Sequence, residues 1–241
     1  EEIQIIRGAA SLQYGTQFGG LVNFIMKKPS KFKNLEVIHR NTFGSNDLYT
    51  NFTSVSGSIK KFSYLSFINY KQGDGFRKNS GFESINTYNY FKYKINKKIW
   101  LSTEFTYLNY IAQQAGGLSD QMFIEDHFQS NRSRNWFQVN WMLYNLHINF
   151  KASSTKTISF NLFGLDAKRD ALGFRTNRVS QVDSGDERDL IKGNFNNYGF
   201  ELKYLSRYKI KSKKSNLLLG TKFYKSDNSS RQGPGSANND A

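Results

Sequence analysis

The stretch Thr157-Ile158-Ser159-Phe160-Asn161-Leu162 alternates polar and apolar side chains at every second residue. This period is typical of a β-strand with one polar and one apolar face. The same alternation recurs in Tyr198-Gly199-Phe200-Glu201-Leu202 and in Phe137-Gln138-Val139-Asn140-Trp141. Applied to the whole chain, the pattern predicts strands near 34–43, 48–58, 62–71, 84–95, 99–110, 136–150, 156–166, 194–207 and 215–225.

The predicted strands are long, and one of them is irregular. Most run about 10 to 14 residues, more than the 5 to 6 typical of soluble sheets, and this length suits a tilted strand that crosses a bilayer. In the strand near 136–150, the apolar positions change phase to Leu146, Ile148 and Phe150. A β-bulge would explain the change, and so would a strand that is apolar on both faces.

The connections between the predicted strands are of two alternating kinds. Short basic turns lie at 60–61, 97–98, 153–156 and 211–214, and longer polar segments lie at 72–83, 111–135, 167–193 and from 226 onward, with only 44–47 brief. Short turns at one end and long loops at the other are typical of an outer-membrane β-barrel. A single-chain bacterial barrel normally closes with an even number of strands, whereas about nine, an odd number, are predicted here. We therefore expect an all-β fold, a partial transmembrane antiparallel β-barrel.

Composition excludes several classes of protein. The chain has 241 residues, 16% of them aromatic, and no cysteine, which argues against disorder and excludes disulfides and cysteine-bound metals. No apolar run approaches the roughly 20 residues of a membrane-spanning helix. The net charge of +15 favours anionic partners.

Residues 1–29 differ from the rest of the chain. Two apolar runs, 3–6 and 21–26, flank a segment rich in glycine and alanine. Glycine permits positive φ and close backbone approach, so the pattern predicts two short buried strands joined by a tight connection. The chain begins Glu1-Glu2-Ile3, with no initiator methionine or export signal, and we expect it to be a piece of a longer protein.

The segment Ile5-Ile6-Arg7-Gly8-Ala9-Ala10, continued by Tyr14-Gly15, Gly19-Gly20 and Lys27-Lys28-Pro29, closely resembles the C-terminal end of the plug domain in TonB-dependent outer-membrane receptors. The resemblance implies that 1–31 is the last plug segment and that 32–241 is the N-terminal part of the barrel, about nine of roughly 22 strands around a plug. It also implies structural roles for plug residues Arg7, Gly8, Tyr14, Gly15, Gly19 and Gly20. Arg7 is expected to pair with Glu104 and Glu201 of the barrel wall.

A second motif, 114–120 followed by Phe123 and by 129–132, resembles an extracellular loop of the ferric-dicitrate receptor branch. This resemblance implies active uptake of a ferric chelate, with ferric citrate first among the candidates. A chelate that presents carboxylates needs forked donors, which arginine supplies. The expected ligand-binding residues are Arg132, Arg134, Arg169, Arg175 and Arg178.

The remaining expectations concern partners and chemistry. By resemblance, the partners are a ferric chelate, the TonB-ExbB-ExbD complex and outer-membrane lipid, and the location is the bacterial outer membrane. His39, His127 and His147 lack the spacing of a metal or catalytic site, so no enzyme and no resident metal or cofactor is expected, and iron enters only as the transported chelate. No nucleic-acid partner is expected, because the basic residues fall at turns and loop tips and not along one strand face. The alternatives are another anionic chelate or a carbohydrate as ligand, or a passive porin or adhesin barrel.

Overall fold

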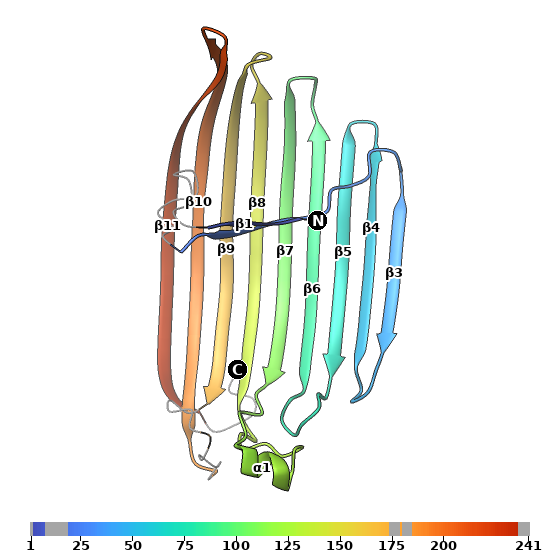
Figure 1. Ribbon diagram of the computed structural model, residues 1–241, viewed down its shortest axis with the longest axis vertical. Helices are drawn as coiled ribbons and strands as arrows, with labels where there is room; N and C mark the ends of the chain where they lie inside the picture. The colour runs from blue at the N-terminus through green and yellow to red at the C-terminus, as the bar shows by residue number, and fades with distance from the viewer. Residues whose placement is uncertain (1, 8–18, 174–178, 180–184, 236–241) are drawn as a thin grey trace.

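The computed structural model describes residues 2–7, 19–173, 179 and 185–235. Nine strands form one antiparallel sheet in which each strand pairs with its neighbours in sequence, from β3 to β11 (Figure 1). The predicted fold class, an all-β partial barrel wall, is confirmed. The strands are β3 (Glu36–Phe43), β4 (Tyr49–Ile59), β5 (Phe62–Gly73), β6 (Phe82–Lys94), β7 (Ile99–Gln113), β8 (Trp136–Lys151), β9 (Lys156–Gly173), β10 (Arg188–Ile210) and β11 (Lys213–Gly235).

All nine predicted strands of the sheet are present, but the last three are longer than predicted. β9 continues to Gly173, β10 begins at Arg188, and β11 continues to Gly235. The expectation that loops begin at 167 and 226 was therefore wrong. These extensions are polar on one face, and that polarity had suggested loops.

The N-terminal segment forms a separate hairpin. β1 (Glu2–Ile6) pairs with β2 (Leu21–Ile25), from Glu2 opposite Ile25 to Ile6 opposite Leu21. In Figure 1 the hairpin runs across the strands of the large sheet. Both expected strands are present, but their side chains are half-buried or exposed among the described residues, so the expectation of buried strands was wrong here.

The two faces of the large sheet are distinguished by the hairpin. Lys27, which follows β2, reaches Glu36 of β3, so the face that carries Glu36 looks toward the N-terminal segment and is called the inner face. Directly opposite residues on neighbouring strands share a face. One inner-face row, read from β8 to β11, is His147, Asn161, Glu201 and Lys222. The next row on the outer face is Leu146, Leu162, Phe200 and Phe223.

This polarity reverses farther along the same strands. Toward the end of the sheet that carries the long connections, outer positions are mostly polar from the row Met142, Asp166, Asn196 and Asp227 to the row Gln138, Asp170, Lys192 and Arg231, and the row beyond it, Trp136, Leu172 and Leu190, is apolar. Most inner positions of β8 there are apolar, as are Leu165 of β9 and Phe195 of β10, whereas Arg169 of β9 is charged. The register of β8 against β7 and β9 is uninterrupted. The phase change in β8 is therefore a switch of the apolar side chains from the inner to the outer face, so both expected explanations, a bulge and a strand apolar on both faces, were wrong.

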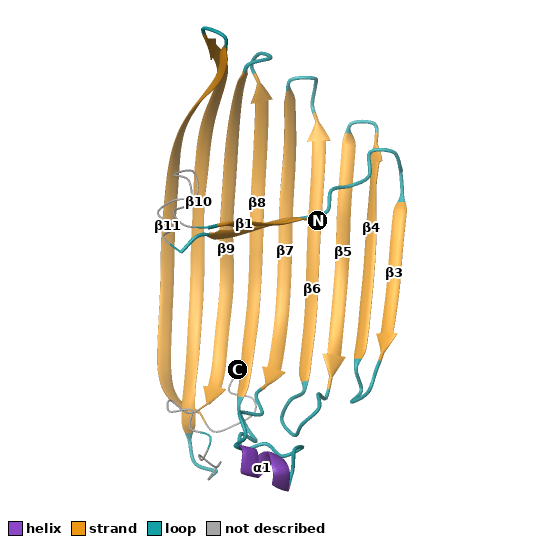
Figure 2. Cartoon of the chain, in the orientation of Figure 1, coloured by secondary structure: helices purple, strands orange, loops and turns teal. Residues whose placement is uncertain are grey.

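The short and long connections lie at opposite ends of the sheet, as predicted (Figure 2). A six-residue helix, α1 (Asp120–Glu125), lies in the long β7–β8 connection and was not predicted. Ser119 caps it, because its hydroxyl accepts a hydrogen bond from the Met122 backbone N–H at 3.3 Å. Within the described residues, no helix has the length and apolar character needed to cross a membrane.

Candidate ligand-binding site

Three long connections gather at one end of the sheet (Figure 2). They are the β5–β6 loop (74–81), the β7–β8 loop (114–135) and the β9–β10 loop (174–187, described at 179 and 185–187). Antiparallel pairing places every second connection at the same end, so residues distant in sequence meet there. This arrangement brings the predicted site residues Arg132 and Arg134 close to the start of β10.

Arg132, Arg134 and Arg188 form an arginine cluster at the base of these loops. Arg132 Nη1 donates to the Asn131 carbonyl oxygen at 2.9 Å, and Arg188 Nη1 donates to Asn135 Oδ1 at 2.8 Å. Arg134 Nη2 donates to the carbonyl oxygen of Asp186 at 2.6 Å. Sequence reasoning found two of the three. Arg188 was missed because it lies in a mixed run, Asp186-Glu187-Arg188-Asp189, that has the composition of a solvated loop.

The electrostatics of the arginine cluster favour an anion. Burial, together with the positive charges of Arg134 and Arg132, lowers the pKa of the Arg188 guanidinium to about 10. Like charges held close together repel, and a bound anion relieves this repulsion. Guanidinium forks are also well suited to carboxylate oxygens. The cluster can therefore bind a negatively charged group.

The burial of each arginine side chain determines whether a ligand can reach it. Arg132 is only 1% exposed and Arg188 only 3%, whereas Arg134 is half-buried. Arg132 also donates from its backbone N–H to Ser130 Oγ at 3.1 Å. In this conformation Arg132 organises the loop, and Arg134 is the more accessible donor. A direct contact between Arg132 and a ligand stays a prediction, and it requires the loop to open.

The β5–β6 loop is fastened to the β7–β8 loop by two side chains. Asn79 Nδ2 donates to the carbonyl oxygens of Gln114 at 3.2 Å and Asn135 at 3.0 Å, and also to that of Arg132. Arg77 donates from Nε to the Gln129 carbonyl oxygen at 3.0 Å. The carbonyl oxygens of one loop are thus satisfied by side chains of the other. Neither residue stood out in the sequence, because the signal lies in the pairing of distant loops.

The β9–β10 loop is joined to the same segment. Asn131 Nδ2 donates to the Val179 carbonyl oxygen at 2.7 Å, and Asp186 accepts from Arg134 as described above. Residues 129–135 therefore contact both neighbouring loops, and we name them the hub segment. The three loops form one connected assembly around this segment.

The other three predicted ligand-binding arginines have different positions. Arg169 lies on β9, so its placement in a loop was wrong. It is exposed on the inner face, and its guanidinium carbon lies 5.7 Å from the ring centroid of Phe195. Arg175 and Arg178 lie outside the described residues. Arg169 therefore lies on the inner face of the wall, near the end that carries the loops of Arg132 and Arg134.

The inner wall contains one further concave region. A hollow of about 370 Å³ opens on the inner face between β7 and β11, and its lining includes Glu104, Asn145, Asn161, Phe163 and Tyr224. Glu104 also hydrogen-bonds the side chain of Tyr88 on the neighbouring strand. Polar side chains and aromatic rings thus line this hollow.

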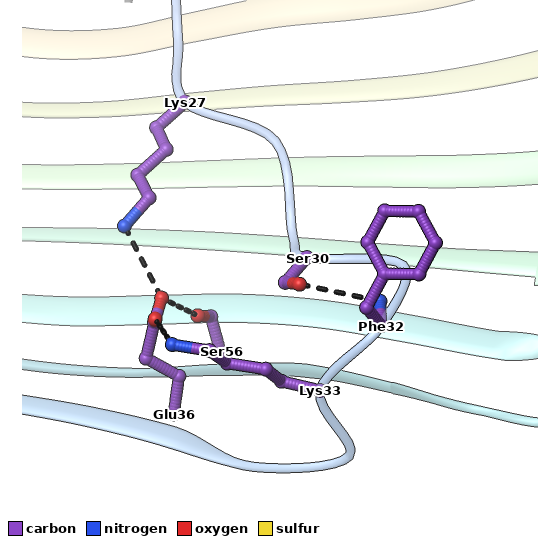
Figure 3. Close-up of polar contacts among 6 residues, drawn as sticks. All are labelled: Lys27, Ser30, Phe32, Lys33, Glu36 and Ser56. Carbon is purple, nitrogen blue, oxygen red and sulfur yellow. Dashed lines mark hydrogen bonds and ion pairs between the residues drawn. The ribbon is translucent and has the colours of Figure 1, made fainter.

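The contacts of the N-terminal segment with the wall differ from those expected. Glu36 accepts from Lys33 at 2.6 Å and from Lys27 at 3.3 Å, and Ser56 Oγ donates to it at 3.5 Å (Figure 3). Arg7 is exposed, and among the described residues no ion pair joins it to Glu104 or Glu201. The expected Arg7 pairing was therefore wrong in this structure. Glu201 pairs instead with Lys203 at 2.6 Å.

Of the expected plug glycines, Gly19 and Gly20 are described. Gly20 has a φ of 99°, a conformation that favours glycine, and it lies immediately before β2. Gly8, Tyr14 and Gly15 lie outside the described residues. In the described ranges, no group of three or more His, Cys, Asp or Glu side chains could hold a metal ion.

Comparison with known proteins adds information on the fold. No family model and no curated protein sequence matches the chain. Among solved structures, the unliganded ferric citrate transporter FecA matches with a TM-score of 0.79 and 20% identity over 97% of this chain. The ferric preacinetobactin receptor BauA from Acinetobacter baumannii matches with a TM-score of 0.76 and 10% identity over 95% of the chain. The ferric-catecholate import receptor Fiu from E. coli matches with a TM-score of 0.73 and 12% identity over 94%.

These matches define the class of fold. The chain spans 35% of FecA, 36% of BauA and 39% of Fiu. The similar proteins are transporters and receptors rather than enzymes. The chain thus has the fold of part of the β-barrel of TonB-dependent iron receptors.

Proposed function

We propose that the chain is part of a TonB-dependent receptor that takes up a ferric chelate across the bacterial outer membrane. The observation that carries the proposal is the arginine cluster at the loop end of a receptor-type barrel wall. A chelate that presents carboxylates would reach this end first and bind to guanidinium groups. The protein makes and breaks no covalent bonds in this role, so it is not an enzyme.

Ferric citrate is the first candidate for the ligand. Its carboxylates suit the arginine cluster, and the resemblance of the loop at 114–132 to the ferric-dicitrate branch supports the choice. The likeness to FecA agrees with it. Arg134, Arg132 and Arg188 would hold the chelate at the loops, and Arg169 would meet it on the inner wall. Arg175 and Arg178 remain proposed contributors from the β9–β10 loop.

Transport would need the other partners expected for this class. The TonB-ExbB-ExbD complex would supply energy, and outer-membrane lipid would surround the apolar outer rows. Iron would pass only as the chelate, with no resident cofactor. A carbohydrate or a different anionic chelate is the competing ligand, and a passive porin or adhesin is the competing class.

Uptake in cells tests the proposal. A strain that lacks the gene, supplied with one iron source at a time, should lose growth on ferric citrate and regain it with the intact gene. Unchanged uptake of radiolabelled ferric citrate, with no paralogue taking over, would exclude citrate. Loss of uptake for a different ferric chelate would retain the receptor class and change the ligand.

Membrane topology has a separate test, and the absence of cysteine gives it no background. Ile124 in α1 is 82% exposed at the loop end, whereas Ser154 and Ser212 lie in turns at the opposite end. A cysteine at 124 should react with a membrane-impermeant thiol reagent on intact cells, and cysteines at 154 and 212 should not. Equal labelling of all three would contradict the proposed orientation.

A further inference from the structure

The inner face of the sheet carries a set of cations near its short-turn end. They lie on β6, β8, β10 and β11 and are called the inner basic group: Lys92, Lys94, Lys151, Arg207, Lys209 and Lys214. The register joins one position of each of these strands to Glu36 in a single inner row: Tyr90, Asn145, Gly199 and Tyr224. Each member lies an even number of residues from its strand's position in that row, so all six share the inner face.

The outer face at the same end is mostly apolar. Phe150, Ile158 and Tyr208 are among its side chains, and on the described strands β6 to β11 only Lys156 and Lys213 carry charge there. Apolar outer positions explain why the polar residues of these strand ends lie on the inner face. They do not explain why the charged ones all have the same sign.

No carboxylate offsets the inner basic group. At levels nearer the short turns than Glu201, the described strands and turns from β6 to β11 contain no Asp or Glu. Glu201 itself pairs with Lys203 at 2.6 Å. In the part of the chain that the structure describes, no ion pair of 4.0 Å or less involves a member of the group. The six positive charges therefore remain available to an external anion.

Aromatic rings hold some of the inner-face cations in place. Lys92 Nζ lies 4.0 Å from the ring centroid of Trp100. Farther along the same row, Lys222 Nζ lies 5.4 Å from the ring centroid of Phe163. The ring quadrupole attracts an ammonium group but does not cancel its charge. The cations are thus positioned by neutral partners, and their positive field stays.

The two ends of the sheet differ in charge balance. The loops 74–81 and 114–135 carry four cations and four carboxylates together. The turns 60–61, 95–98, 152–155 and 211–212 carry five lysines and no carboxylate. The excess positive charge of the described wall therefore lies at the short-turn end, where the inner basic group adds to that of the turns.

We infer that the inner basic group is a second anion-binding site, which meets the anionic ferric chelate as it leaves the receptor at the short-turn end. This inference rests on the proposed function. Rings of lysine and arginine that line a passage favour anions, and a field of one sign raises the local concentration of the opposite charge. An acidic protein that docked from outside would meet the turn tips first, whereas inner-face side chains are reached from the interior.

The residue types at the two ends suit different tasks. The loop end uses arginine, whose planar fork grips a carboxylate through two hydrogen bonds. Five of the six members of the inner basic group are lysines, and an ammonium attracts an anion as a flexible, strongly hydrated point charge. The arginine cluster therefore suits capture, and the inner basic group suits weak binding followed by release.

Uptake by cells that carry the full-length receptor tests this inference. Lys151→Gln with Lys209→Gln removes one inner-face charge from the β8–β9 hairpin and one from the β10–β11 hairpin. The control, Lys156→Gln with Lys213→Gln, removes one outer-face charge from each of the same hairpins. With radiolabelled ferric citrate at saturation, the inner variant should take up the chelate about fivefold more slowly, and the control should match the parent. Surface binding to energy-depleted cells should be unchanged in both.

A charge-preserving variant separates loss of charge from loss of folding. Lys151→Arg with Lys209→Arg keeps both positive charges on the inner face and should take up ferric citrate at nearly the parent rate. If this variant is as slow as the glutamine variant at the same receptor level, charge is not the cause and the inference fails.

The remaining outcomes also overturn the inference. Parent-like uptake by the inner variant means that the inner basic group takes no part, and the proposed function then stands. Equal slowing of the inner variant and the control means that face is irrelevant, as docking of an acidic partner protein at the turns would predict. Weaker surface binding by the inner variant would place its effect at the loop end. If the parent takes up no ferric citrate, the proposed ligand fails in the deletion experiment and this inference fails with it.

Discussion

The two ends of the β8–β11 wall both alternate polar and apolar side chains, but the apolar side chains lie on opposite faces of the sheet. Toward the short turns, the outer row of Leu146, Leu162 and Phe200 is apolar and the inner row of His147, Asn161 and Glu201 is polar. Toward the long loops, the outer rows that contain Asp166, Lys168 and Asp170 are mostly charged or amide-bearing, and inner positions include Val139 and Phe195. The strands and their register are continuous across the change.

The difference shows that alternation specifies a strand but not its surroundings. An outer apolar row suits hydrocarbon, whereas an outer charged row needs water or headgroups. With the proposed outer-membrane location, the change of polarity at Met142 and Asp166 would mark the limit of the membrane band on this wall. Beyond it, the same strands support the loop assembly and the arginine cluster.

The sharpest test of this comparison places one charge in each region of β10. Leu202→Arg puts a guanidinium on the outer apolar face, and it should lower the free energy of unfolding by about 2–4 kcal/mol. Asn196→Arg is the matched control on the same face and strand, opposite Asp227, and should cost less than about 1 kcal/mol. Denaturant titration of the full-length receptor in lipid vesicles measures both. Equal costs would remove the proposed boundary.

The second test concerns the arginine cluster at the loop end. Arg132→Ala in the full-length receptor should weaken ferric citrate binding by about 1.5–3 kcal/mol, because charge-assisted hydrogen bonds of this strength are lost. Arg132→Lys should restore part of the affinity, since the charge returns without the fork. Binding is followed by titration of tryptophan fluorescence.

Lys213→Ala is the control for that test, because it removes a cation at the short-turn end of β11. It should leave ferric citrate affinity unchanged. If Arg132→Ala binds as well as Lys213→Ala, Arg132 only organises its loop, as its burial suggests. Arg134→Ala then becomes the decisive variant, since this side chain is the more accessible one.

The third test concerns the hydrogen bonds that join the β5–β6 loop to the β7–β8 loop, in comparison with a strand position of the wall. Asn79→Ala removes the donor shared by Gln114, Arg132 and Asn135 and should cost about 1–2 kcal/mol locally. Backbone amides of 114–135 should then exchange hydrogen faster, by about tenfold. Asn228→Ala, which removes an amide that donates to the nearby Ser226 hydroxyl at 2.7 Å, is the control. Unchanged exchange in the Asn79 variant would show that the loops are held by other contacts.

The smallest effect is expected where the N-terminal segment meets the wall. Glu36 bonds to Lys27 and Lys33, whose side chains are 44% and 59% exposed. Exposed pairs contribute little, so Glu36→Gln should cost about 0.2–1 kcal/mol, less at high salt. A double-mutant cycle with Lys27→Gln isolates the pair. A coupling above 2 kcal/mol would mean that the pair is better shielded than its exposure indicates.

Much of the fold was predictable from local signals. Period-two alternation located all nine strands of the sheet, and the alternation of turn and loop lengths predicted the two ends. The strand ends of β9, β10 and β11 were not predictable in the same way. Their outer positions, such as Asp166 and Lys192, have the composition of loop residues, and only pairing with neighbours shows that they are in strands.

The candidate site was predictable only in part. Arg132 stood out because it lies in a recognisable loop motif, and Arg134 because it lies in the same long loop. Arg169 proved to be on a strand, and Arg188 was missed. Burial of a guanidinium depends on which loops fold over it, and sequence spacing does not contain that information. Asn79 is the clearest case, because its three partners lie 35 to 56 residues away.

The sequence by itself determined the class of secondary structure, the number of strands and the basic, arginine-bearing loops, because alternation, turn composition and charge are properties of neighbouring residues. Only the tertiary structure decided which face is apolar at each level, which arginines are buried and which carboxylate each cation meets. Those outcomes depend on register and loop packing between distant segments. In this wall the register is constant, but the alternating pattern meets two different environments. The environment of each side chain therefore depends on its position along the strand.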